Sequence, residues 1–144
     1  MDNQILIELR AKLVVDTNQL HLSAQEQPEL MQLAGELAAE AKYAARKARL
    51  AAEIASATAA KDIRKNPATF GISKVTESSI SEAVVLHPQV VKANTEAIEA
   101  DKESDMAATI AVAFEHRKAV LRIEADLYAN EYWGRANAVF PANY

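Results

Sequence analysis

The sequence predicts an all-α protein, and three observations support this fold class. Half of the 144 residues are apolar, with Ala the commonest of them, whereas aromatic residues make up only 6%. Ala is the best helix former, and strands favour aromatic and β-branched residues instead. No stretch alternates apolar and polar residues for long enough to predict a sheet. Two long stretches, residues 23–65 and 88–133, run almost free of Gly and Pro, and each ends within two residues of a Pro or Gly.

The N-terminal segment predicts a short helix over about residues 3–12, because its apolar residues fall on one side of a helix. The Leu-Val-Val-Asp stretch that follows, residues 13–16, fits either an extended link or a last helical turn. Asp16 and Thr17 are both good N-cap residues for a further turn.

The first long stretch predicts a helix over about residues 23–65, which would be about 63 Å long at 1.5 Å per residue. Ser23 and Glu26 have the spacing of a capping box, so we expect the helix to start at Ser23. Pro28 then belongs to the first turn or marks a start just before it. Asn66 precedes a Pro and therefore avoids the helical conformation, which ends the helix.

Alanine dominates the apolar pattern of this helix. Alternating steps of four and three residues, typical of a coiled-coil seam, connect Leu30, Ala34, Leu37, Ala41, Ala44, Ala48, Ala51, Ala55 and Thr58. A second row repeats every seven residues at Ala38, Ala45, Ala52 and Ala59, and a bulkier third row contains Tyr43, Leu50 and Ile54. We expect the first row to be a close-packed seam, because Ala lets two helices approach closely. The alternative is that Ala is abundant only because it favours helices.

The middle of the chain predicts a turn and a short helix. Residues 66–75 contain Pro and Gly and are expected to form a loop. A short helix is expected over about residues 77–86, where Ser79 and Glu82 have the spacing of a second capping box. Pro88 then forces a corner.

The last helix is expected over about residues 88–133, from a Pro at its first position to a Gly just past its end. Its apolar stripe begins at Val91 and Ile98, and residues 101–105 are polar on all sides, so we expect them in solvent. The stripe then widens through Met106, Ile110, Ala113, Phe114, Val120, Leu121, Leu127, Tyr128 and Tyr132. The tail, residues 134–144, shows no clear periodicity.

The similar lengths of the two long helices predict an antiparallel hairpin with two short helices attached, as one helical domain over residues 1–144. A helix this long needs a partner along its length. One pair of helices has too little interior for so many apolar rows, so we also expect a homo-oligomer.

The sequence contains no catalytic signature. The absence of Cys excludes disulfides, thiolate catalysis and Cys-ligated zinc, and no nucleotide-binding loop, zinc-protease or nucleophile-elbow motif occurs. Glu115, His116 and Glu124 lack the second Glu-x-x-His motif of a metal site in a bundle. We therefore expect no enzyme, no metal and no cofactor. No apolar run has the length of a signal peptide or a membrane span, so we expect a cytoplasmic protein with no membrane partner.

Charge is unevenly distributed, although the net charge is only −4. Residues 42–65 carry seven cations against two acids, a net of +5, and residues 96–105 carry five acids against one Lys, a net of −4. Cations along a helix can follow a phosphate backbone without reading bases. The candidate nucleic-acid-binding residues are Lys42, Arg46, Lys47, Arg49, Lys61, Arg64 and Lys65. A solvated helix face is the alternative, and the last three also suit the dipole of a helix C-terminus.

This layout resembles the phage recombination mediator family of the UvsY type. The similarity includes a short amphipathic first helix, an Asp-Thr link at residues 16–17, a long basic helix, a loop, a short helix and a long last helix. The Lys47-Ala48-Arg49-Leu50 run matches a DNA-contacting run of the family, whereas an ungapped alignment places residues 61–65 near that position. This chain is acidic and rich in Ala, unlike the basic family pattern.

The resemblance implies a ring-like homo-oligomer that binds single-stranded DNA and helps to load a recombinase onto strands coated by single-strand-binding protein. It also implies a location in the host cytoplasm if a phage encodes the chain. We therefore expect a non-enzymatic recombination mediator. The alternative is a structural or protein-interaction helical oligomer that does not bind nucleic acid.

Overall fold

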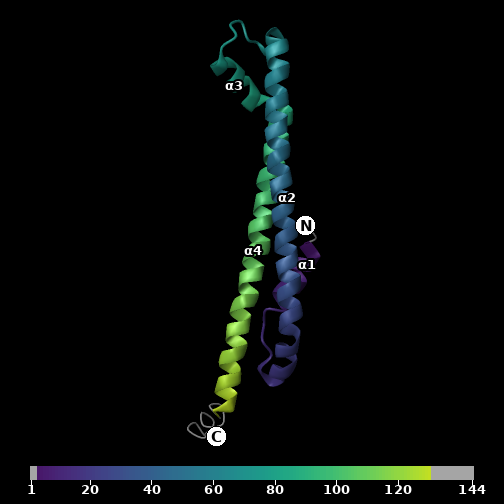
Figure 1. Cartoon of the computed structure of the whole chain (residues 1–144), viewed down its shortest axis with the longest axis vertical. Helices are drawn as coiled ribbons and strands as arrows, with labels where there is room; N and C mark the ends of the chain where they lie inside the picture. The colour runs from purple at the N-terminus through teal and green to yellow at the C-terminus, as the bar shows by residue number, and fades with distance from the viewer. Residues whose placement is uncertain (1–2, 131–144) are drawn as a thin grey trace, which may run out of the picture. The chain divides into compact units, whose positions relative to one another are not determined.

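The computed structural model describes residues 3–130, and within them every regular element is a helix. The all-α prediction is therefore confirmed. The elements are α1 (Asn3–Ala11), a 3₁₀ turn (Thr17–Gln19), α2 (Leu20–Lys65), a second 3₁₀ turn (Pro67–Phe70), α3 (Glu77–Leu86) and α4 (Pro88–Ala129) (Figure 1). The expected helix end at residue 133 and the tail 134–144 lie outside the described residues.

The contacts of the chain group into two compact units, and both long helices contribute to each. Unit 1 comprises residues 1–38 and 107–144, and unit 2 comprises residues 39–106. In unit 1, α1 and the first part of α2 pack with the last part of α4. In unit 2, the rest of α2 lies antiparallel to the first part of α4, with α3 between them in the chain (Figure 1). Each unit therefore has its own helical core.

Helix α2 begins at Leu20, three residues before the expected start. The Asp16 side chain accepts a hydrogen bond from the backbone N–H of Asn18 and caps the 3₁₀ turn that leads directly into α2. Ser23 therefore lies inside the helix, where it is buried and its hydroxyl accepts a hydrogen bond from the Asp16 backbone N–H at 3.3 Å. The prediction of Asp16 as a cap is confirmed, and the capping box expected at Ser23 is wrong.

Two further expectations about helix starts are corrected. Pro28 lies inside α2 rather than in its first turn. Helix α3 is capped by Thr76, whose side chain accepts a hydrogen bond from the Ser79 backbone N–H, while the Ser79 hydroxyl accepts one from the Thr76 backbone N–H. Ser79 is thus the second member of a capping box, and not the first member of one with Glu82.

In unit 2, the buried face of α2 is a row of Ala that differs from the expected row at every second step. Buried or half-buried positions follow steps of four and three at Ala41, Ala45, Ala48, Ala52, Ala55 and Ala59. The expected seam members Ala44, Ala51 and Thr58 are exposed. The expected row would continue into Asp62 and Lys65, which are exposed, whereas the next buried residue after Ala59 is Ile63, four residues further on and fully buried. Burial of Ile63 without burial of those charges favours the observed register.

The facing stripe of α4 in unit 2 also lies one residue away from its expected position. Val90 and Ala97 are buried, whereas Val91 and Ile98 are exposed. The expectation that residues 101–105 lie in solvent is wrong for Asp101, which is partly buried and paired with Arg49. Val91 and Ile98 are therefore outside the seam, and Val90 is inside it.

The core of unit 1 contains bulkier residues than the Ala row of α2 in unit 2. Leu6 and Leu9 of α1 and Ala34 of α2 are buried, as are Ala107, Ile110, Phe114 and Leu121 of α4. One charged residue, Arg117, lies on the same buried stripe of α4 and is only 4% exposed.

Candidate nucleic-acid interface

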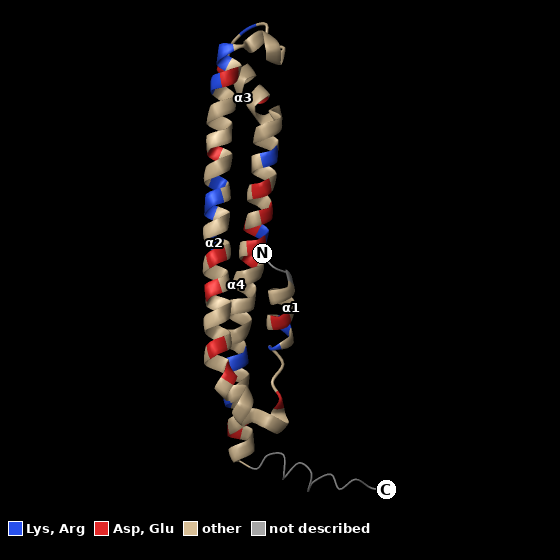
Figure 2. Cartoon of the chain, turned by 90° about the vertical axis from the view of Figure 1, so that its right-hand side faces the viewer, with Lys and Arg blue, Asp and Glu red and all other residues tan. Residues whose placement is uncertain are grey.

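The seven predicted cations all lie on the part of α2 that belongs to unit 2. They form two groups along the helix. The first group contains Lys42, Arg46, Lys47 and Arg49, and the second, in the last two turns, contains Lys61, Arg64 and Lys65. The basic segment of α2 lies beside the acidic segment of α4 (Figure 2).

Two of the seven cations are held by acids from other elements. The Arg49 Nε donates a hydrogen bond to Asp101 Oδ2 at 3.0 Å, and its Nη2 lies 2.9 Å from Oδ1. The Arg64 Nη2 donates to Glu77 Oε2 of α3 at 3.0 Å. These contacts compensate both charges within unit 2, so Arg49 and Arg64 are poor candidates for phosphate binding.

The other five cations are exposed and form no ion pair with any residue in the described part of the chain. Arg46 and Lys47 are three and four residues after Tyr43, so all three side chains lie on one face of α2. The Tyr43 side chain is 68% exposed. We call Tyr43, Arg46 and Lys47 the basic-aromatic patch.

The charge of the whole unit limits how strongly this patch can attract an anion. Residues 39–106 carry ten Lys and Arg and ten Asp and Glu, so unit 2 has no net charge. The positive potential is therefore local to the outer face of α2, because the acidic segment of α4 lies beside it. Exposed charges farther apart than about 10 Å are largely screened at 0.1 M salt.

Sequence reasoning missed two features of the site region. The first is Asp101 as the partner of Arg49. Its sequence signal is the opposite charge of residues 42–65 on α2 and residues 96–105 on α4. The second is a buried polar network in unit 1. Ser23 and Gln27 of α2 and Arg117 of α4 occupy buried positions there. Its signal is Arg117 between Phe114 and Leu121, at the spacing of the apolar stripe.

Comparisons with models of protein families, with curated proteins and with solved structures found no match to this chain. None of the helices in residues 3–130 combines the length and apolar character that crossing a membrane requires. In the same residues, no three His, Asp or Glu side chains come together in a group that could hold a metal ion.

Proposed function

We propose that this protein is a non-enzymatic single-stranded-DNA-binding protein that acts as a recombination mediator. The observation that supports binding is the basic-aromatic patch, in which two cations without an ion pair lie one turn after an exposed Tyr on one face of α2. Arg46 and Lys47 would contact phosphates, and the Tyr43 ring would stack on a base. A stacking aromatic inside a basic groove or face is the usual way in which proteins hold single strands without reading sequence.

The patch is small, so one chain would bind weakly. Two cations and one ring contact only a few nucleotides, and the neutral unit around them adds no long-range attraction. A homo-oligomer would repeat the patch along the strand and raise the affinity by multivalency. The role in loading a recombinase onto strands coated by single-strand-binding protein rests on the family resemblance alone.

Binding is tested by the fluorescence anisotropy of a labelled oligo-dT strand, measured over a range of salt concentrations. We expect log affinity to fall linearly with log salt, with a slope of about −0.7 for each phosphate neutralised. Arg46→Ala with Lys47→Ala should weaken binding and flatten the slope by about 1.4. The matched control is Lys118→Ala with Arg122→Ala, which removes two exposed cations from unit 1. Absence of binding by the wild-type protein at low salt would contradict the proposal.

The stacking contact is tested separately. Tyr43→Ala should cost about 1–3 kcal/mol of binding free energy for each stacked base, whereas Tyr43→Phe keeps the ring and should bind nearly as the wild type does. An abasic strand of equal length should bind wild type and Tyr43→Ala equally. If Tyr43→Ala weakens binding to both strands alike, the ring does not stack.

A second candidate function, a structural helical oligomer, is favoured by the apolar residues on the same face of α2. Leu50 and Ile54 are 56% and 58% exposed and continue the four–three spacing from Tyr43 and Lys47. On α4, Val91, Ile98 and Asp105 repeat every seven residues on an exposed face. Both faces expose apolar residues, so burying one against the other in a second copy of the chain would remove apolar surface from water.

The two candidates predict different outcomes for the same face. If the protein is a structural oligomer, Leu50→Glu with Ile54→Glu should dissociate the assembly, so that light scattering gives the mass of one chain. Neither the wild type nor this variant should then bind a strand. In the mediator, these changes leave the patch in place, so the protein still binds an oligo-dT strand. The single variant Leu50→Glu is a control for the folding of α2. Glu is a good helix former, so the helicity of the protein should not fall.

A further inference from the structure

Arg117 of α4 is a buried cation for which the described residues supply no acid partner. Its Nη1 donates hydrogen bonds to the Ser23 backbone carbonyl at 3.1 Å and to Gln27 Oε1, and both acceptors are neutral. Gln27 is fixed in turn, because its Nε2 donates to the Phe114 carbonyl at 2.8 Å. Removing a charge from water is costly unless an opposite charge compensates it. Here the polar partners orient the guanidinium but leave its charge uncompensated.

The other edge of the Arg117 guanidinium has no partner. Nε is buried and makes no hydrogen bond, and Nη2 makes none with any described residue. Nε and Nη2 together form the edge of an Arg that binds carboxylate and phosphate groups with two parallel contacts. Arg49 of the same chain uses this edge to face Asp101. The edge that is occupied in Arg49 is therefore without a partner among the described residues in Arg117.

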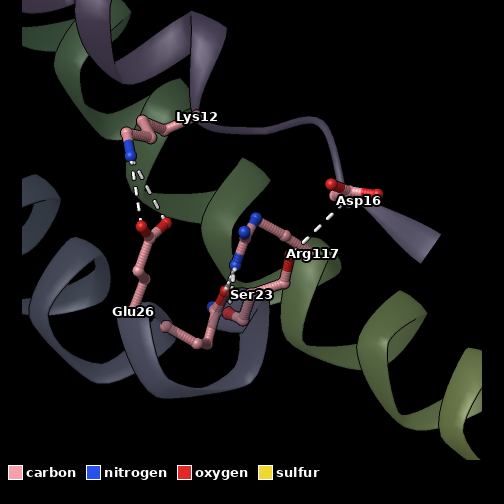
Figure 3. A network of polar contacts seen from close by, with 6 residues as sticks. Lys12, Asp16, Ser23, Glu26 and Arg117 are labelled. Atoms are coloured by element: carbon pink, nitrogen blue, oxygen red, sulfur yellow. Dashed lines mark hydrogen bonds and ion pairs between the residues drawn. The ribbon is translucent and has the colours of Figure 1, made fainter. Parts of the chain in front are cut away.

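A cavity of about 230 Å³ adjoins Arg117 within unit 1. Its lining includes Lys12, Asp16, Ser23 and Glu26, which Figure 3 shows around the guanidinium. The two acids already have partners, because Lys12 pairs with Glu26 at 3.3 Å and Asp16 accepts a hydrogen bond from Asn18. Both members of the Lys12–Glu26 pair are about half exposed and so are screened by solvent, whereas Arg117 is not.

We infer that this cavity is a binding site for a small oxyanion group, a phosphate, sulfate or carboxylate, held by the free edge of Arg117. The volume accommodates such a group together with several water molecules, because one water molecule occupies about 30 Å³. The group contacts Nη2, and the side chains that line the cavity have to move before it also reaches Nε, which is buried. The site is independent of the basic-aromatic patch, which belongs to unit 2.

The test measures thermal unfolding of the full chain with increasing inorganic phosphate, at an ionic strength held constant with sodium chloride. A ligand that binds the folded state raises the melting temperature with a saturable dependence on its concentration. Phosphate also stabilises proteins in general by exclusion from their surface, without saturation. We expect a saturable rise in the wild type, which disappears in Arg117→Gln and persists in Lys118→Gln, the exposed neighbour. Parallel titrations with sulfate and acetate distinguish a tetrahedral ligand from a carboxylate.

A direct measurement completes the test. Phosphate affinity from ³¹P NMR line broadening should fall at least tenfold in Arg117→Gln. Because Arg117→Gln alters a buried network and can unfold the protein, a second variant blocks the cavity and leaves Arg117 in place. Val14 lines the cavity and is 77% exposed, so Val14→Trp should keep the fold and abolish phosphate binding. The inference is overturned if wild type, Arg117→Gln and Val14→Trp respond alike to all three anions.

Discussion

Arg49 and Asp101 lie 52 residues apart in the sequence, yet the Arg49 Nε donates a hydrogen bond to Asp101 Oδ2 at 3.0 Å. The pair joins the basic segment of α2 to the acidic segment of α4 within unit 2. With the pair of Arg64 and Glu77, it compensates two of the seven cations of α2 within unit 2. It also engages Arg49, one member of the Lys-Ala-Arg-Leu run that carries the family resemblance, and so makes this residue a weaker candidate for phosphate contact.

Loss of the Arg49–Asp101 pair should have little effect on stability. The Arg49 side chain is 64% exposed, and exposed ion pairs contribute about 0.2–1 kcal/mol. Arg49→Ala, Asp101→Ala and the double variant form a cycle whose coupling free energy urea unfolding measures. On our assignment of the patch, Arg49→Ala alone leaves strand affinity within about twofold of the wild type, about 0.4 kcal/mol. A loss as large as that of Lys47→Ala would return Arg49 to the DNA-binding residues.

The observed seam register predicts a contrast between two Ala positions six residues apart. Ala45 is buried, and Ala51 is exposed. Ala45→Leu overfills the contact between α2 and α4 in unit 2 and should cost about 1–3 kcal/mol of unfolding free energy. Ala51→Leu should change it by no more than about 0.5 kcal/mol, as is usual for surface positions. Equal effects of the two variants in chemical denaturation would show that the seam follows the other row.

The start of α3 should depend on Thr76. Thr76→Ala removes the side-chain acceptor for the Ser79 backbone N–H and should cost about 0.5–2 kcal/mol. Thr76→Ser keeps the acceptor and is the matched control. Thermal unfolding followed by circular dichroism compares the two variants. If the control loses as much stability as Thr76→Ala, the cap hydrogen bond is not what Thr76 contributes.

The buried network of unit 1 should respond non-additively to substitution. Gln27→Met removes one of the two acceptors of the Arg117 guanidinium, leaving the Ser23 carbonyl, and removes the side-chain donor to the Phe114 carbonyl. Breaking hydrogen bonds of buried polar groups in this way costs about 1–3 kcal/mol. Gln27→Met with Arg117→Met replaces both polar side chains by apolar ones and should be less destabilising than the sum of the two single variants. Additive losses in urea unfolding would mean that the two side chains do not act as a unit.

Most of the helices could be predicted from the sequence because their limits are set by local chemistry. The first long helix ends at Lys65, two residues before Pro67, and Pro88 opens the second, because Pro lacks an N–H and restricts the residue before it. The start of α2 could not be placed in this way. Asp16 and Ser23 are both good caps in isolation, and the turn between them decides which one the chain uses.

The candidate site was predictable as a set of cations and not as an arrangement. Exposed Lys and Arg on α2 follow from helical periodicity, and Tyr43 follows from the same period. The neutralisation of Arg49 by Asp101 and of Arg64 by Glu77 depends on how α2 faces α4 and α3 in unit 2. Helical spacing alone contains no information about which partner lies opposite a given turn.

By itself, the sequence determined that this chain is all-α and that two long helices would need each other. That much follows from Ala content, from apolar periodicity and from the positions of Pro, which act on the backbone locally. Only the tertiary structure decided which Ala row of α2 is buried and that Arg117 lies in a core. Ala occurs on several faces of α2, so more than one seam satisfies helical periodicity. The choice depends on burying Ile63 and Val90 together while Asp62 and Lys65 stay in water.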